Sequence, residues 1–144
     1  MTNRVTSAVV VDTMAVSALV NATRQPEPAS EYSALIAGRP IVISFATVTE
    51  LRYGASKAGR GQLRKRALER DLTHFVVVQP DDRLISICAD LRASCEAAGH
   101  ALGQKLHEAD RWIAATALRL QLELISDDAV FQDVPSLAVR SRDS

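Results

Sequence analysis

This chain of 144 residues has few cysteines, few aromatic residues and no net charge. Its two cysteines, Cys88 and Cys95, lie seven positions apart without a partner at zinc-ligand spacing, so we expect two small apolar side chains facing the core. Aromatic residues make up 4% of the chain, which excludes base stacking as the main mode of any nucleic-acid binding. The 17 basic and 17 acidic residues cancel, so overall charge argues neither for nor against such a partner.

Long apolar runs are also missing, since none approaches the ~18–20 residues of a membrane span. We therefore expect no membrane association and a cytoplasmic location. The composition, 47% hydrophobic and 24% charged, is typical of a globular chain. Without repeats, low-complexity segments or a linker, residues 1–144 are expected to form a single domain.

Strand and helix patterns alternate along the chain. Between the expected strands, apolar residues follow helical spacing at 84–95 and 112–120, and Asp81 or Asp82 can begin the first of these helices while Gly99 can end it. The strands are short, continuous apolar runs, as in a parallel sheet that is covered on both faces. This pattern predicts an α/β fold. The expected strands are 8–11, 41–45, 75–78, 122–126 and, as a possible fifth, 137–139.

Acidic residues stand where such a sheet places functional sites, at the carboxyl ends of its strands. Asp12 follows the first strand, and Glu50 lies just inside the helix after the second. Asp110 opens the helix before the fourth strand, and Asp127 and Asp128 follow that strand. Converging carboxylates repel one another and need a cation or shared protons. Because Mg²⁺ and Mn²⁺ prefer oxygen ligands, either ion is the natural partner of this cluster.

Each acid also has a purely structural alternative. Asp12 can cap the first helix, and Glu50 stands three residues after Thr47, which matches a capping box. Asp110 can be a solvated surface residue. Either aspartate after the fourth strand can cap a short helix that holds Phe131.

The contexts of these acids resemble the motifs of PIN domains, in order and spacing, over nearly the whole chain. The specific likeness is to VapC-type toxins of bacterial type II toxin–antitoxin pairs. It implies a three-layer α/β/α sandwich with a central, mainly parallel sheet of four to five strands. It also implies an endoribonuclease that uses Mg²⁺ or Mn²⁺ to activate water. The segments that carry the resemblance are 9–13 with Ser17 and Leu19, 43–55, 107–118 as the most specific, and 124–128 with Phe131 and Leu137.

Carried over by position, the resemblance makes Asp12, Glu50 and Asp110 catalytic acids of the metal site. Asp128 fits the fourth acid best, because it stands three residues before the phenylalanine of the closing motif, and Asp127 is the alternative.

Three further positions bear on the metal site. Thr13 and Ser126 match polar positions that support the acids. Position 14 is Met where the family often has Asn or Ser, so a catalytically weak or inactive PIN-like domain that binds protein or RNA is the alternative function.

Candidate RNA contacts come from basic residues. Arg52, Lys105 and Arg111 lie close in sequence to the acids and are the candidates for the scissile phosphate. The resemblance also implies a cognate antitoxin, a homodimer, and promoter DNA bound only through the antitoxin complex. A wider basic stretch, which is either an RNA-binding face or a solvated helix surface, comprises Arg52, Lys57, Arg60, Arg64, Lys65, Arg66 and Arg70.

Two other α/β classes are disfavoured by what the chain lacks. A phosphoacceptor signalling domain needs an acidic pair at the first strand and a late lysine, but Asp12 stands alone and no lysine follows Lys105. A haloacid-dehalogenase-type phosphatase needs a second aspartate two positions after Asp12, where this chain has Met14.

Overall fold

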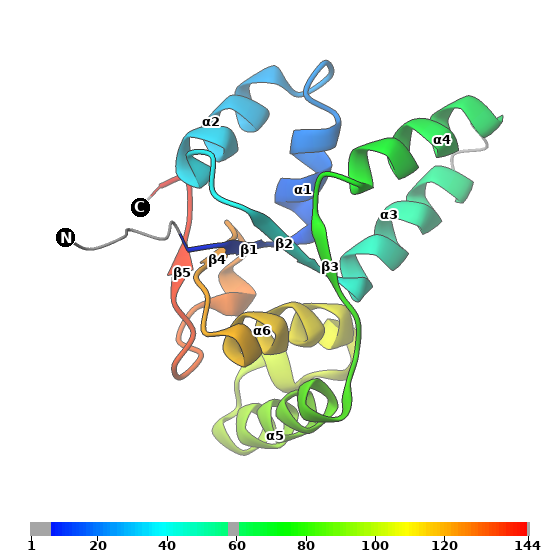
Figure 1. Cartoon of the computed structure of the whole chain (residues 1–144). Coiled ribbons are helices and arrows are strands. Elements are labelled where there is room, and N and C mark those ends of the chain that lie inside the picture. The colour runs from blue at the N-terminus through cyan, green and yellow to red at the C-terminus, as the bar shows by residue number, and fades with distance from the viewer. Residues whose placement is uncertain (1–6, 58–60, 144) are drawn as a thin grey trace.

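A parallel sheet with helices on both faces forms the centre of the computed structural model, which describes residues 7–57 and 61–143 (Figure 1). Every neighbouring pair of its strands is parallel, and Val10 lies opposite both Val42 and Leu124. The α/β fold with a parallel sheet is thus confirmed. A fifth strand is present, but it begins two residues later than expected, at Val139. In sheet order, the strands are β3 (Val76–Val78), β2 (Ile41–Ser44), β1 (Val9–Val11), β4 (Leu124–Ile125) and β5 (Val139–Arg140).

The helices begin and end largely where sequence signals predict. The Asp81 carboxylate caps α5 by accepting a hydrogen bond from the Leu84 backbone N–H, and Gly99 ends that helix in the left-handed conformation. None of the described helices is long and apolar enough to cross a membrane. The helices are α1 (Thr13–Val20), α2 (Pro26–Ile36), α3 (Phe45–Lys57), α4 (Gly61–Leu72), α5 (Asp82–Ala98) and α6 (Glu108–Leu120), with short 3-10 helices η1 (Ala101–Gly103), η2 (Lys105–His107) and η3 (Ala129–Phe131).

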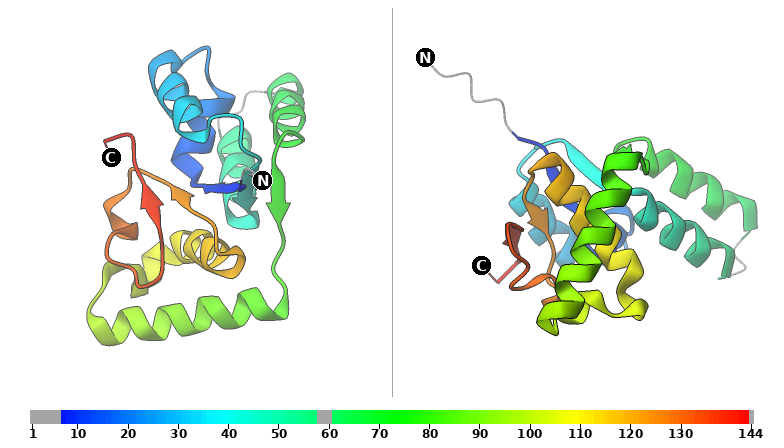
Figure 2. Two further views of the ribbon diagram at one scale, coloured as in Figure 1. Left: turned by 60° about the vertical axis from the view of Figure 1, so that its left-hand side comes forward. Right: turned by 90° about the horizontal axis from the view of Figure 1, so that it is seen from below.

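Alternation along β1 divides the core into two layers. Val10 packs in a cluster with residues of α5 and α6, including Leu91 and Ile113. Val9 and Val11 project from the opposite face and pack in a cluster with α1 and α2. The left view of Figure 2 shows the sheet between these helix pairs. The expected three-layer sandwich is therefore present.

The third strand departs from the expectation of burial on both faces. Val76 is 57% exposed, because β3 is an edge strand that pairs only with β2. Cys88 and Cys95 are free and buried, as expected from the sequence.

Close packing between η1 and α5 depends on a glycine. A Cβ atom built on Gly103 lies 2.6 Å from the backbone nitrogen of Glu96, whereas one built on Gly54 in α3 has no atom within 4 Å. We expect Gly103→Ala to lower the free energy of unfolding by about 1–3 kcal/mol through overpacking.

Gly54→Ala is the matched control, and it should raise the free energy of unfolding by about 0.5–1 kcal/mol because alanine is the better helix former. Urea denaturation followed by circular dichroism measures both variants. Equal effects of the two substitutions would contradict the packing argument.

Candidate active site

The four predicted acids line one cleft of about 870 Å³ at the carboxyl end of the sheet. Residues of α1, α3 and α4 form much of its wall. The cleft contains side chains of Asp12, Glu50, Asp110 and Asp128, together with Thr13. Residues separated by up to 116 positions thus reach the same space, as the parallel topology predicts.

Asp12 is buried, with an exposed fraction of 5%. One carboxylate oxygen accepts a hydrogen bond of 2.9 Å from the Ala15 backbone N–H and so caps α1. The other oxygen accepts a hydrogen bond from the Ser126 hydroxyl. Burial raises the pKa of Asp12, only partly offset by these two bonds, and the negative charge of Asp128 raises it further. The capping role and a role in the cleft therefore coexist in one side chain.

The Ser126 hydroxyl links two of the acids. It donates to Asp12 and accepts a hydrogen bond of 3.0 Å from the Asp128 backbone N–H. Asp128 in turn caps η3, since its Oδ1 accepts a hydrogen bond of 2.9 Å from the Val130 backbone N–H. One fully buried hydroxyl thus couples the end of β1 to the loop after β4.

Glu50 is held by a threonine of α1. The Thr13 hydroxyl lies 2.7 Å from Glu50 Oε1, to which it donates, and 3.0 Å from the Thr47 hydroxyl. The capping-box alternative is wrong, because α3 begins at Phe45 and Thr47 is already inside the helix rather than at its cap.

Asp110 lies in the first turn of α6, where the helix dipole favours negative charge. Its Oδ2 is 2.9 Å from His107 Nδ1, and its side chain is 28% exposed. The side chain is therefore oriented by a neighbour and is only partly solvated.

The donor set in the cleft matches the chemistry of a hard divalent cation. Its carboxylate oxygens are the ligands that Mg²⁺ and Mn²⁺ prefer. As the side chains lie, no three His, Cys, Asp or Glu residues of 7–57 and 61–143 are grouped to hold one metal ion. Glu50 is exposed and has rotatable bonds, so it has freedom to move toward a cation.

Two of the predicted RNA-contacting residues are engaged elsewhere. Arg111 is 2% exposed, and its guanidinium donates to the backbone carbonyls of Leu102 and Gln104, at 2.9 and 2.5 Å. This contradicts the interpretation of Arg111 as a phosphate contact, because its buried guanidinium binds these carbonyls and holds the segment before α6 in place. Arg52 forms a two-pronged ion pair with Glu69 and does not line the cleft.

Other cations line the cleft instead. Arg24, in the turn between α1 and α2, and Arg64, on α4, contribute to its wall. Arg64 belongs to the basic stretch seen in the sequence, of which Arg60 lies outside the described residues. Lys105 is exposed on η2 and is not a lining residue. No motif marks Arg24, so only the tertiary structure could reveal it.

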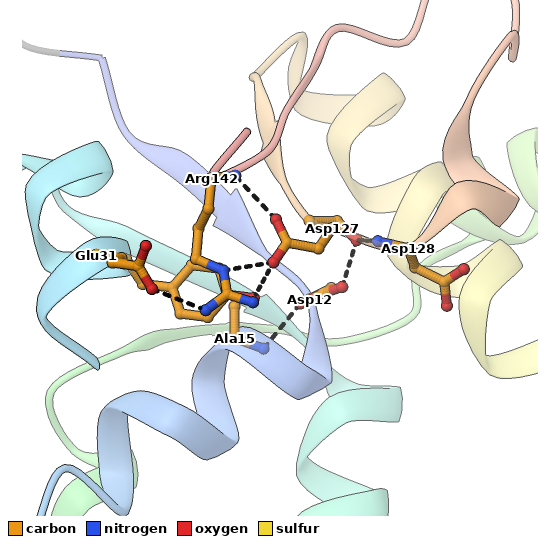
Figure 3. Close-up of polar contacts among 8 residues, drawn as sticks. Asp12, Ala15, Glu31, Asp127, Asp128 and Arg142 are labelled. Atoms are coloured by element: carbon orange, nitrogen blue, oxygen red, sulfur yellow. Dashed lines mark hydrogen bonds and ion pairs between the residues drawn. The ribbon is translucent and has the colours of Figure 1, made fainter. Parts of the chain in front are cut away.

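The two aspartates after β4 point in opposite directions (Figure 3). Asp128 lines the cleft, while Asp127 turns toward α2 and the C-terminal segment, where it contacts Tyr32 and Arg142. The geometry therefore favours Asp128 over Asp127 as the fourth acid. Tyr32 and Arg142 lie far apart in the chain and match no motif, so no sequence pattern marks them.

Known proteins resemble this chain over most of its length. The protein-family model described as PIN domain matches residues 9–137. Among solved structures, the chain is similar to a chain of VapBC2 from Rickettsia felis bound to a DNA fragment from the promoter, with 20% identity, a TM-score of 0.76, and coverage of 93% of this chain and 98% of that one.

It is also similar to a chain of VapBC-1 from nontypeable Haemophilus influenzae, with 25% identity, a TM-score of 0.71, and coverage of 95% and 99%. A third similar structure is DNA-bound VapBC from Salmonella typhimurium, with 22% identity, a TM-score of 0.73, and coverage of 94% and 98%. No curated protein sequence matches the chain significantly.

The likeness inferred from the sequence motifs is confirmed by these comparisons. The family match includes the segments that place Asp12, Glu50, Asp110 and Asp128 in the cleft. This protein therefore belongs to the PIN domain family, whose members are nucleases.

Proposed function

We propose that this protein is a Mg²⁺- or Mn²⁺-dependent endoribonuclease and the toxin of a toxin–antitoxin pair. The observation that carries the proposal is the convergence of Asp12, Glu50, Asp110 and Asp128 on one cleft in a PIN domain. A cleft with this many acids repels RNA phosphates unless cations compensate their charge.

The four acids are the residues that would hold the metal, with Asp127 retained only as the less favourable alternative to Asp128. When bound, Mg²⁺ or Mn²⁺ supplies positive charge that stabilises the transition state and lowers the pKa of a coordinated water. The chain supplies orientation: Ser126 holds Asp12, Thr13 holds Glu50 and His107 holds Asp110.

Two arginines of the cleft are the candidates for binding the RNA backbone. Arg24 and Arg64 line the same space as the acids, so they can contact phosphates on either side of the scissile bond. Lys105 is exposed near the start of α6 and remains a candidate for more distant phosphates. Balanced overall charge makes this local placement more important than any long-range attraction.

The antitoxin is the proposed protein partner. Support comes from the similar chains, which were solved in VapBC complexes, two of them bound to DNA. From the resemblance of the sequence motifs to VapC-type toxins, we also propose a homodimer that contacts promoter DNA only through its antitoxin complex. The cytoplasm is the expected location, since both RNA and promoter DNA are found there.

Cleavage of total cellular RNA by the purified, antitoxin-free protein tests the function. We expect cleavage with Mg²⁺ or Mn²⁺, none with EDTA, and products with 5′ phosphate and 3′ hydroxyl ends, because water is the nucleophile. Ends with 2′,3′-cyclic phosphate would contradict water attack. Absence of cleavage under all conditions would favour the alternative, a PIN-like domain that binds protein or RNA without catalysis.

A further inference from the structure

The C-terminal segment after β5 folds back onto the loop that carries Ser126 and Asp128. The Arg142 backbone N–H donates to Asp127 Oδ1 at 2.8 Å, and its side-chain Nε donates to Asp127 Oδ2 at 2.5 Å. The guanidinium also forms an ion pair of 3.1 Å with Glu31 on α2. Arg142 therefore joins the chain terminus, α2 and the acidic loop (Figure 3).

Tyr32 completes this arrangement from the core of the protein. It is 1% exposed, and its hydroxyl donates to Asp127 Oδ2 at 2.8 Å. The guanidinium of Arg142 lies over the tyrosine ring, 4.7 Å from the ring centroid. Three hydrogen bonds from Arg142 and Tyr32 therefore fix the orientation of the Asp127 carboxylate.

Anchoring Asp127 restricts the side chain that follows it. The backbone at Asp128 is extended, with φ −76° and ψ 125°. Consecutive side chains of an extended segment point to opposite sides, so fixing Asp127 against the C-terminal segment directs Asp128 into the cleft. On the other side of Asp127, the Ser126 hydroxyl binds both Asp12 and the Asp128 backbone N–H.

Charge reinforces the geometry. Asp12 and Asp128 are already acidic neighbours in the cleft, and Asp127 adds a third negative charge close behind them. Arg142 offsets that charge locally, at a side-chain exposure of 28%. Without it, the loop would carry an uncompensated carboxylate beside the two acids of the site.

We infer that Arg142, together with Tyr32, is a positioning residue for this active site, because it holds Asp127 and thereby orients Ser126 and Asp128 in the cleft. This inference rests on the proposed function and deepens it. Arg142 touches neither RNA nor metal in this role. Its effect passes entirely through the loop after β4.

Arg142→Gln tests the inference. Glutamine removes the positive charge and the guanidinium N–H groups, but it keeps the backbone N–H that donates a hydrogen bond to Asp127. In the metal-free protein, we expect the Asp128 amide to exchange its hydrogen about 10-fold faster. Calorimetric titration with Mn²⁺ alone should show an affinity about 10-fold lower. RNA cleavage should lose about 10-fold in kcat while KM changes less than about twofold. Arg142→Lys, which keeps the charge, should recover part of each loss.

Arg39→Gln is the matched control. Arg39 is similarly half-buried and forms an ion pair of 3.1 Å with Glu123, at the opposite end of β4 from the cleft. It should leave Asp128 exchange, Mn²⁺ affinity and kcat unchanged. Equal values of all three in Arg142→Gln and Arg39→Gln would overturn the inference.

Tyr32→Phe provides a second variant, since it removes one hydrogen bond to Asp127 but preserves the ring in the core. We expect smaller changes in amide exchange, Mn²⁺ affinity and kcat, in the same direction as in Arg142→Gln. If Arg142→Gln is poorly folded, faster amide exchange at Asp128 in Tyr32→Phe still supports the inference. Failure of the wild-type protein to cleave RNA would remove the proposed function. Amide exchange at Asp128 would still decide the positioning role of Arg142.

Discussion

Asp12→Asn is expected to lower metal-dependent RNA cleavage on the order of 10³-fold while the fold persists. Asparagine keeps the oxygen that accepts the Ala15 N–H, so α1 remains capped. It removes the negative charge that would bind the cation. Since burial raises the pKa of Asp12, the charged carboxylate is disfavoured in the folded state. Removing this charge should offset the loss of the hydrogen bond that Asp12 accepts from Ser126, so the metal-free protein should keep its fold.

Single-turnover cleavage and thermal unfolding of the metal-free protein measure these two effects separately. Asp81→Asn is the matched control, because Asp81 caps α5 through the same kind of bond, 2.8 Å to the Leu84 N–H, but lies outside the cleft. It should cleave RNA at the wild-type rate. Wild-type activity in Asp12→Asn would exclude the proposed metal site.

Asp128→Asn is expected to reduce cleavage by about 10²-fold or more, because it removes a carboxylate from the cleft while asparagine can still cap η3. Asp127→Asn should cost only about 10-fold, since Asp127 acts through its bonds to Tyr32 and Arg142.

Mn²⁺ titration of the two variants distinguishes the loss of a metal ligand, expected for Asp128→Asn, from a displacement of the loop, expected for Asp127→Asn. Asp128→Asn should weaken Mn²⁺ binding more than Asp127→Asn. The reverse order, in both affinity and rate, would identify Asp127 as the fourth acid and contradict the orientation of the loop.

Local sequence patterns predicted the elements that depend on neighbouring residues. Continuous apolar runs such as Val9–Val11 indicated a sheet buried on both faces. This prediction held for the central strands but not for the two edge strands, where Val76 of β3 and Arg140 of β5 are exposed. The caps at Asp81 and Gly99 were also predicted, because a helix terminus is specified by residues within one turn.

The candidate acids were identified for the same reason. Asp12, Glu50 and Asp128 each follow a strand closely, and Asp110 lies in the first turn of the helix that leads into β4. The carboxyl ends of parallel strands meet at one edge of a sheet. Their meeting in one cleft therefore required only a correct assignment of strands.

Side-chain partners across the molecule could not be predicted in this way. Proximity in sequence suggested that Arg111 contacts phosphate, but its helix turns the guanidinium into the core and onto backbone carbonyls. Arg24 was overlooked because a turn, rather than a motif, brings it to the cleft.

The sequence by itself determined the fold class, the family and the four acids that reach the cleft, since these follow from local periodicity and short motifs. Only the tertiary structure decided how those residues are oriented. It separated Asp128 from Asp127 and joined Asp127 to Tyr32 and Arg142, 95 and 15 positions away. Such contacts arise when packed elements bring distant side chains together, and no local pattern encodes that geometry.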